Sequence, residues 1–360
     1  MLTNENYTKD NIQRIREQTK ADPSIIERTV FAFGLLEAIS KVGLTFIFKG
    51  GTSLMVLLSE PRRFSTDIDI IVEPETNIDD YIQRAGVLFP FKRVEEHFRD
   101  VKRGIEKRHF RFYFDSPYSE EEIRVLLDVV FEENPYPRVV EKEVDNSLLL
   151  SEGENLLVRI PDKNCILGDK LTAFAPHTTG IPLGIGKELE IIKQMYDCWT
   201  ILQEMDDYEM VSQVYHRVSY IEMGYRNLNL TPKDCLFDTI QSCICILGTG
   251  SIKKDEYKKY LEGIDAIKNH LFNGKINGQI AEKCACEIMY LAACLLTGNE
   301  YMQIENPDAY RTVKLPIKGI KKVSGIKNVD PVSYAKIVRS FQMLLEFGLF
   351  TNGVLESMND

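Results

Sequence analysis

The sequence contains no apolar run of the roughly 18 residues that a membrane-spanning helix needs. Residues 1–6 are polar and do not form a basic segment followed by an apolar one, so we expect no signal peptide and no membrane anchor. Positive charge is also scarce, because the net charge of the 360 residues is −10 at pH 7. A broad basic surface for nonspecific nucleic-acid binding is therefore not expected, although one local basic cluster is present: Lys102, Arg103, Lys107, Arg108 and Arg111.

Paired metal-binding cysteines and histidines are missing too. None of the eight cysteines has a partner at C-x-x-C spacing, and most lie in apolar stretches with helical character. We interpret them as reduced thiols in the core of a cytoplasmic protein. The five histidines lack paired spacing, which disfavours zinc. The chain has 27% charged and 44% hydrophobic residues, which is typical of a globular protein. Its 360 residues are enough for two domains.

A glycine-rich turn follows the first strand-like segment of the chain. The apolar residues 45–48 have the length of a strand and lead into Gly50, Gly51, Thr52 and Ser53. Two adjacent glycines predict a tight turn that lets the backbone approach a ligand closely. A short helix is expected directly afterwards, and its first amide groups would point at an anion.

Two further strand-like segments carry carboxylates. Residues 64–72 are expected to form a strand in which Asp67 and Asp69 share one face, because side chains alternate along a strand. Residues 109–114 and 123–131 read as a strand and its return strand. The return strand carries Asp128 within an otherwise apolar run, which is unusual for a buried strand. The main alternative for Asp128 is a buried carboxylate with satisfied hydrogen bonds.

The first half of the chain mixes helical and strand patterns, whereas the second half is helical. Apolar residues recur at helical spacing over residues 25–42, and further helices are expected over residues 208–298 and 332–347. We therefore predict an α+β fold. A mixed sheet with flanking helices would occupy residues 1–205, and an all-helical domain would occupy residues 206–360.

Three charged residues lie in the helices expected where the two halves meet. Lys170 lies within residues 166–175, and Lys193 and Asp197 lie within residues 187–202. Each has an ordinary explanation, since the lysines could lie on helix surfaces and Asp197 could pair with a lysine. The loop between these helices, residues 176–186, has little positive charge, and its His177 is more typical of a solvated side chain than of acceptor binding.

Together the turn and the carboxylates match what nucleotidyl transfer requires. Divalent cations that bridge a triphosphate need hard oxygen ligands, which Asp67, Asp69 and Asp128 would supply. The glycine-rich turn would hold the phosphates through backbone amides. A D-x-D pair alone is usually a strand edge, and a G-G-T-S segment alone is usually just a turn. The combination, with Asp128 added, indicates a metal–nucleotide site.

These motifs resemble those of the AbiEii/AbiGii-type nucleotidyltransferase toxins, which belong to the polymerase-β-like nucleotidyltransferase superfamily. The resemblance rests on residues 48–54, 63–69, 127–129, 168–171 and 193–197. It implies a polymerase-β-like catalytic domain over residues 1–205, in which Lys170 and Asp197 complete the active site. Lys170 and Lys193 would assist the turn in binding the NTP, and Asp67, Asp69 and Asp128 would bind Mg²⁺.

The resemblance also implies a biological role and a partner. Such a protein would be the toxin of a toxin–antitoxin or abortive-infection pair, with a winged-helix antitoxin as its partner and the 3′ end of tRNA as its acceptor. Two alternatives stay open. The acidic net charge favours a small cationic acceptor such as an aminoglycoside, and the helical half could be an interaction module on a non-catalytic nucleotide-binding scaffold.

Overall fold

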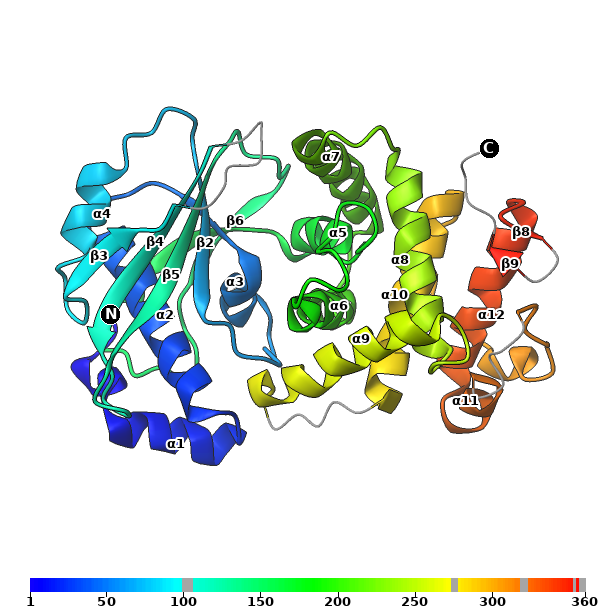
Figure 1. The fold of residues 1–360 in the computed structure, drawn as a ribbon, viewed down its shortest axis with the longest axis horizontal. Helices are drawn as coiled ribbons and strands as arrows, with labels where there is room; N and C mark the ends of the chain where they lie inside the picture. Colours follow the sequence, from blue (N-terminus) through cyan, green and yellow to red (C-terminus); the bar gives the residue numbers. More distant parts are fainter. Residues whose placement is uncertain (99–105, 273–277, 318–322, 352–353, 356–360) are drawn as a thin grey trace. The chain divides into compact units, whose positions relative to one another are not determined.

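The computed structural model describes residues 1–98, 106–272, 278–317, 323–351 and 354–355. The chain divides into two compact units (Figure 1). The first comprises Met1–Ile166 and Lys268–Lys275, and the second comprises Leu167–Ile267 and Ile276–Asp360. The domain boundary predicted at residue 205, between a catalytic and an all-helical domain, stays a prediction.

A five-stranded mixed sheet forms the centre of the first unit. Its strand order is β1-β2-β5-β4-β3, and β2 runs parallel to β5 whereas the other neighbours are antiparallel. The strands are β1 (Ile47–Lys49), β2 (Asp67–Val72), β3 (Arg93–Glu96), β4 (Glu106–Asp115) and β5 (Glu122–Phe131). The predicted α+β class is confirmed, because this mixed sheet has flanking helices and is followed by a helical region.

One face of the sheet is apolar and buried. Alternation along the strands turns residues such as Ile70, Phe112 and Leu127 to this face, where they are fully buried. Helix α2 (Pro23–Lys41) packs against the sheet, and the Phe31 ring stacks on Phe114 with 3.5 Å between centroids. Each such buried side chain contributes about 1.5–3 kcal/mol, so this layer holds the strands in register and leaves the opposite face polar.

Shorter elements complete the first unit. They are η1 (Asn4–Tyr7), α1 (Lys9–Thr19), α3 (Gly50–Leu57), α4 (Asp79–Ala85) and the paired strands β6 (Val139–Glu143) and β7 (Leu157–Pro161). A segment from the second half of the chain joins them. The Phe64 amide donates to the His270 carbonyl at 2.7 Å, and the Phe64 and Phe272 rings lie 4.3 Å apart between centroids.

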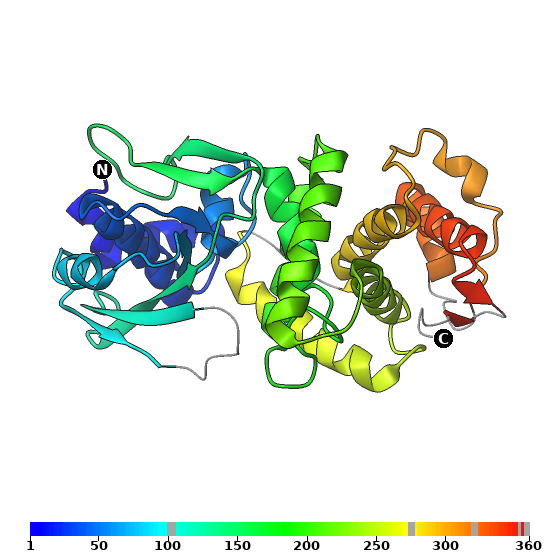
Figure 2. The same cartoon turned by 90° about the horizontal axis from the view of Figure 1, so that it is seen from above.

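The second unit is almost entirely helical. The division between the units falls within α5 (Lys163–Ala173). The remaining α-helices are α6 (Glu188–Leu202), α7 (Tyr208–Arg226), α8 (Pro232–Leu247), α9 (Lys254–Ala266), α10 (Gly278–Thr297), α11 (Val323–Val329) and α12 (Pro331–Glu346). Helix α10 packs against α6, α8 and α12, and Figure 2 shows it in gold beside the red α12.

Two shorter 3₁₀ helices, η2 (Ile267–His270) and η3 (Pro307–Tyr310), and the paired strands β8 (Phe350–Thr351) and β9 (Val354–Leu355) complete the element order. All eight cysteines are buried free thiols, as the sequence predicts. Within the described residues, no helix is both long and apolar enough to cross a membrane.

Candidate active site

The glycine-rich turn joins β1 to α3 directly beside the carboxylate of Asp69. Gly50 has φ = +79°, a conformation that side-chain-bearing residues rarely adopt. A Cβ atom on Gly50 would lie 2.0 Å from the Asp69 Oδ2 atom. Glycine is therefore required at this position both by the backbone conformation and by the close approach of the carboxylate.

The rest of the turn is held by its own side chains. Thr52 Oγ1 donates to the Asp67 carbonyl at 2.6 Å, and Ser53 Oγ donates to the Gly50 carbonyl at 2.9 Å. Both residues are fully buried. A Cβ on Gly51 would lie 2.7 Å from Arg63 Nη2. The Thr52 hydroxyl thus fastens the turn to β2, and the Ser53 hydroxyl holds the turn to its own first residue. The groups suited to hold an anion are the backbone amides at the N-terminus of α3, where Lys49 makes no side-chain cap.

The strand register places four charged or titratable residues in one row across the polar face. Lys49 pairs with Asp69, Asp69 with Asp128, and Asp128 with His109. Asp67 lies on the same face, two residues before Asp69 on β2. Adjacent strands are about 4.8 Å apart, so the three predicted carboxylates are brought to neighbouring positions on one surface.

Asp128 is not a fully buried carboxylate. Its side chain is 28% exposed, and its Oδ1 atom lies 2.7 Å from His109 Nδ1. This exposure argues against the alternative in which Asp128 is simply a satisfied buried group. The sequence predicted a strand over residues 109–114 but no role for His109. Its position on the less buried face of β4, together with Arg111 and Tyr113, is the feature that could have indicated a role.

The donor set suits a hard divalent cation that arrives with phosphate ligands. Among the described residues, no three His, Cys, Asp or Glu side chains converge closely enough to hold a metal by themselves. Mg²⁺ usually keeps several waters and is held by one or two carboxylates plus substrate phosphates, rather than by an all-protein cage. Asp67 and Asp69, on one face and beside the Gly50 turn, provide two such carboxylates.

Lys170 and Asp197 form a buried ion pair within the second unit. Lys170 Nζ lies 2.8 Å from Asp197 Oδ2, and the two side chains are 8% and 2% exposed. Lys170 also donates to Gln194 Oε1 at 3.1 Å. Lys193 pairs instead with Glu190 at 3.0 Å. The structure therefore brings together two of the predicted residues, and it also shows the ordinary ion pair that the sequence allowed for Asp197.

The predicted basic cluster is only partly described. Lys102 and Arg103 lie outside the described residues. Arg108 is held by Asp79 at 2.8 Å and by Glu96 at 2.7 Å, so its charge is compensated. Arg111 lies on the polar face of the sheet, in the register pair Arg111–Leu126.

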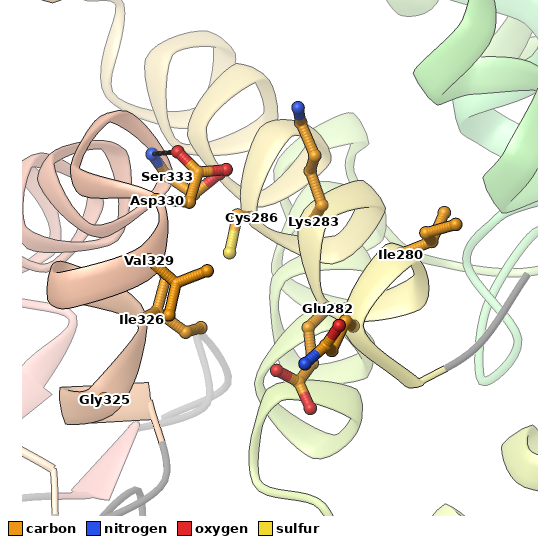
Figure 3. Close-up of a pocket in the computed structure, with 10 residues that line it drawn as sticks. Ile280, Glu282, Lys283, Cys286, Gly325, Ile326, Val329, Asp330 and Ser333 are labelled. Atoms are coloured by element: carbon orange, nitrogen blue, oxygen red, sulfur yellow. Dashed lines mark hydrogen bonds between the residues drawn. The ribbon is translucent and has the colours of Figure 1, made fainter.

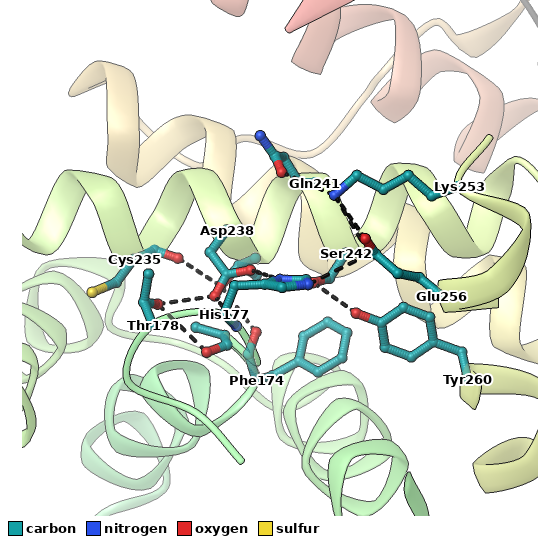
Figure 4. A network of polar contacts seen from close by, with 12 residues as sticks. Phe174, His177, Thr178, Cys235, Asp238, Gln241, Ser242, Lys253, Glu256 and Tyr260 are labelled. Carbon is teal, nitrogen blue, oxygen red and sulfur yellow. Dashed lines mark hydrogen bonds and ion pairs between the residues drawn. The ribbon is translucent and has the colours of Figure 1, made fainter. Parts of the chain in front are cut away.

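A polar network in the second unit contains a residue that the sequence analysis missed (Figure 4). Asp238 accepts from the His177 and Thr178 side chains at 2.7 and 2.9 Å and from the His177 amide at 2.8 Å. The hydrogen bond to Asp238, with help from Glu256, raises the pKa of His177. Asp238 lies in the apolar run of residues 235–240, the same signal that indicated Asp128, and it anchors the loop that follows Phe174.

Two cavities lie away from all these groups. One, of about 460 Å³, lies between α10 and α11–α12 and is lined by apolar side chains that include Ile280, Ile326 and Val329 (Figure 3). The other, of about 320 Å³, lies beside Tyr7 and Phe89 in the first unit. Neither is lined by a predicted site residue.

A known protein family matches the part of the chain that carries the motifs described above. A family model described as "Nucleotidyl transferase AbiEii toxin, Type IV TA system" matches residues 34–239, more than half of the chain. The solved structure of JHP933 from Helicobacter pylori is 16% identical, with a TM-score of 0.42 over 76% of this chain and 93% of that one. Another H. pylori structure, described as a candidate nucleotidyltransferase, is 16% identical, with a TM-score of 0.44 over 77% of this chain and 99% of that one. No curated protein matches.

Proposed function

The chain belongs to the AbiEii family of nucleotidyltransferase toxins of type IV toxin–antitoxin systems, and we propose that it transfers a nucleoside monophosphate from an NTP to an acceptor hydroxyl with the help of Mg²⁺. The observation that carries this proposal is the register between β2 and β5. It sets Asp69 opposite Asp128 on the polar face that also carries Asp67, and the Gly50 turn touches Asp69.

Each group at this surface has a proposed role. Asp67, Asp69 and Asp128 would hold Mg²⁺, which when bound neutralises the triphosphate and favours attack at its α-phosphorus. The backbone amides of Gly51, Thr52 and Ser53 would bind the β- and γ-phosphates, because the first amides of a helix lack intrahelical acceptors.

The transfer itself is a single displacement. The acceptor oxygen forms a bond to the α-phosphorus while the bond from that phosphorus to the oxygen bridging the β-phosphate breaks, so pyrophosphate leaves with that oxygen. Asp128 takes up the proton of the attacking hydroxyl. His109, at 2.7 Å, fixes the orientation of the Asp128 carboxylate for this role.

Lys170, Asp197 and Lys193 are assigned their roles by the family resemblance. Lys170 would balance charge on the triphosphate or on the departing pyrophosphate, and Asp197 would position it. The buried contact of 2.8 Å between Lys170 and Asp197 supports this positioning role. Lys193 would contribute to nucleotide binding once its contact with Glu190 is exchanged for phosphate.

The proposed acceptor is the 3′ end of tRNA, and the proposed compartment is the cytoplasm. Membership of a toxin–antitoxin family implies an antitoxin partner, for which we propose a winged-helix protein. Eight buried free cysteines support a reducing compartment. The second candidate acceptor is a small cationic hydroxyl compound such as an aminoglycoside, which the net charge of −10 favours.

A labelling experiment tests the proposal. Total RNA and an aminoglycoside panel are each incubated with the protein, Mg²⁺ and each of the four α-³²P-labelled NTPs. We expect labelled RNA with the wild type and at least about a 100-fold loss with Asp67→Ala/Asp69→Ala. Asp80→Ala, which removes a largely exposed carboxylate on α4, is the control and should label normally. Equal labelling by the wild type and the double variant would rule out the proposed metal site.

A further inference from the structure

Two arginines lie on the polar face of the sheet next to the carboxylates. Arg111 on β4 pairs with Leu126 on β5, and Arg124 pairs with Tyr113. Arg111 is therefore a diagonal neighbour of both Arg124 and Asp128, and diagonal neighbours across two strands lie about 7–8 Å apart. Arg111 thus lies next to the carboxylate that would receive the acceptor proton, and Arg124 lies four residues before that carboxylate on the same strand.

Other cations of this sheet pair with carboxylates, whereas Arg124 makes no such pair among the described residues and Arg111 lies opposite Glu95, a carboxylate that already pairs with Arg93. Arg93 pairs with Glu95 and Glu122, and Lys92 pairs with Asp115. In contrast, the buried Arg111 Nε atom has no hydrogen-bond partner. Arg124 is exposed and makes no ion pair with any carboxylate of the described residues. In a chain of net charge −10, two neighbouring arginines, one without an ion pair to any described residue and one with an unbonded Nε atom, indicate a surface that binds an anion.

The strand order shows which substrate this anion would belong to. The Gly50 turn lies at the β1 side of Asp67 and Asp69, and the two arginines lie on the opposite side, on β5 and β4. In the proposed function the triphosphate occupies the β1 side, so the acceptor approaches from the β4 side. A negative group close to the attacking hydroxyl is a phosphate of the chain that precedes a 3′-terminal nucleotide.

We propose that Arg111 and Arg124 bind backbone phosphates of a nucleic-acid strand next to its 3′ end and so direct its terminal hydroxyl to Asp128. This inference rests on the proposed function and adds its acceptor site. Guanidinium groups suit the role because they bind phosphate in a bidentate manner and always carry their charge. A cationic small acceptor would be repelled at the same place.

The test compares binding and transfer on the full-length chain. A single-stranded oligonucleotide with a free 3′ hydroxyl is the acceptor, and its dissociation constant is measured by fluorescence anisotropy from low to moderate salt. The variants are Arg111→Gln, Arg124→Gln and their combination, with Arg111→Lys to keep the charge. Arg93→Gln is the matched control, because it removes the same charge from a compensated position on the same face.

We expect each Gln variant to weaken oligonucleotide binding and to raise the KM for the oligonucleotide by about tenfold, with the KM for NTP changed less than about twofold. Each lost phosphate contact should also lower the slope of log affinity against log salt by about 0.7 on a single strand. Arg111→Lys should keep the slope with intermediate affinity, and Arg93→Gln should behave as the wild type.

Two outcomes would overturn the inference. One is a folded double variant that binds the oligonucleotide with the affinity and salt slope of the wild type. The other is a double variant that uses an aminoglycoside better than the wild type does, with the aminoglycoside as the only acceptor of either protein. The two proposals fail separately. Arginine-dependent binding without any NMP transfer would refute the proposed function and leave the arginine site standing. Transfer to RNA that is insensitive to both arginines would refute the site alone.

Discussion

Replacing Gly50 by alanine perturbs the contact between the turn and the carboxylate row. The new Cβ atom would lie 2.0 Å from Asp69 Oδ2 and 2.7 Å from its Cγ. Ordinary van der Waals contact begins at 3.4 Å, so the carboxylate must move by about 1.4 Å (3.4 − 2.0) or the turn must open. Either change separates Asp69 from the helix N-terminus beside which it lies.

The expected effect has two parts. The positive φ of +79° costs a side-chain-bearing residue roughly 1–2 kcal/mol of stability, before any cost of moving Asp69. A displacement of about 1 Å at a catalytic group can cost on the order of 100-fold in rate, so we expect kcat for NMP transfer to fall by about that factor. Urea unfolding measures the first part, and the labelled-NTP assay measures the second.

Gly43→Ala is the matched control. Gly43 has φ = +82°, and a Cβ there would meet nothing within 4 Å. It should therefore lose similar stability through backbone strain and keep its transfer rate. If Gly50→Ala also kept the wild-type kcat while remaining folded, the position of Asp69 against the turn would not matter for catalysis, and the reasoning from the turn to the site would be refuted.

Three further predictions follow from single contacts. Asp128→Asn should lower kcat by more than about 100-fold, because the amide cannot accept the proton, and should weaken NTP affinity measured by calorimetry far less, because the amide oxygen can still face Mg²⁺; equal losses in both would assign Asp128 to binding instead. Asp197→Ala leaves Lys170 buried and unpaired and should cost about 3–5 kcal/mol in urea unfolding, whereas Asp255→Ala at an exposed pair should cost less than about 1 kcal/mol. His177→Gln should remove a pH-dependent part of the stability. Because Asp238 raises the pKa of folded His177, its stabilisation is full below the unfolded value near 6.5 and is lost as the pH rises through the folded pKa. A stability difference between wild type and variant that grows with pH would contradict this assignment.

Local patterns accounted for much of the fold. The alternation of side chains along a strand agrees with the burial seen over residues 67–70 of β2 and 125–131 of β5, whereas Ile71 is buried although it shares the face of Asp69. The helix expected over residues 25–42 is α2, which begins at Pro23 directly after Asp22, and the Asp22 carboxylate accepts from the Ser24 amide at 2.8 Å. β6 was not predicted, because its residues are half-buried or exposed and carry three charges, so no apolar alternation marks it.

Hydroxyl roles in the turn were not readable from the sequence. Nucleotide binding by Thr52 and Ser53 stays a prediction, and their hydroxyls donate to backbone carbonyls. The hydrogen-bond partner of a hydroxyl depends on which acceptors lie within a few ångströms of it in the folded chain, and the sequence does not give those positions. The anion-binding capacity of the turn lies in its amides, which every residue except proline possesses.

The sequence by itself determined the family, the enzyme class and the composition of each local motif, because a glycine turn and a D-x-D strand are short-range features. Only the tertiary structure decided which motifs meet. β2 and β5 pair in parallel although two strands lie between them in the chain, and this pairing sets Asp69 opposite Asp128. It also placed His109 against Asp128 and set Arg111 and Arg124 on the same face of the sheet. Such contacts depend on the register of distant strands, which is fixed by packing of the buried face and not by neighbours in the chain.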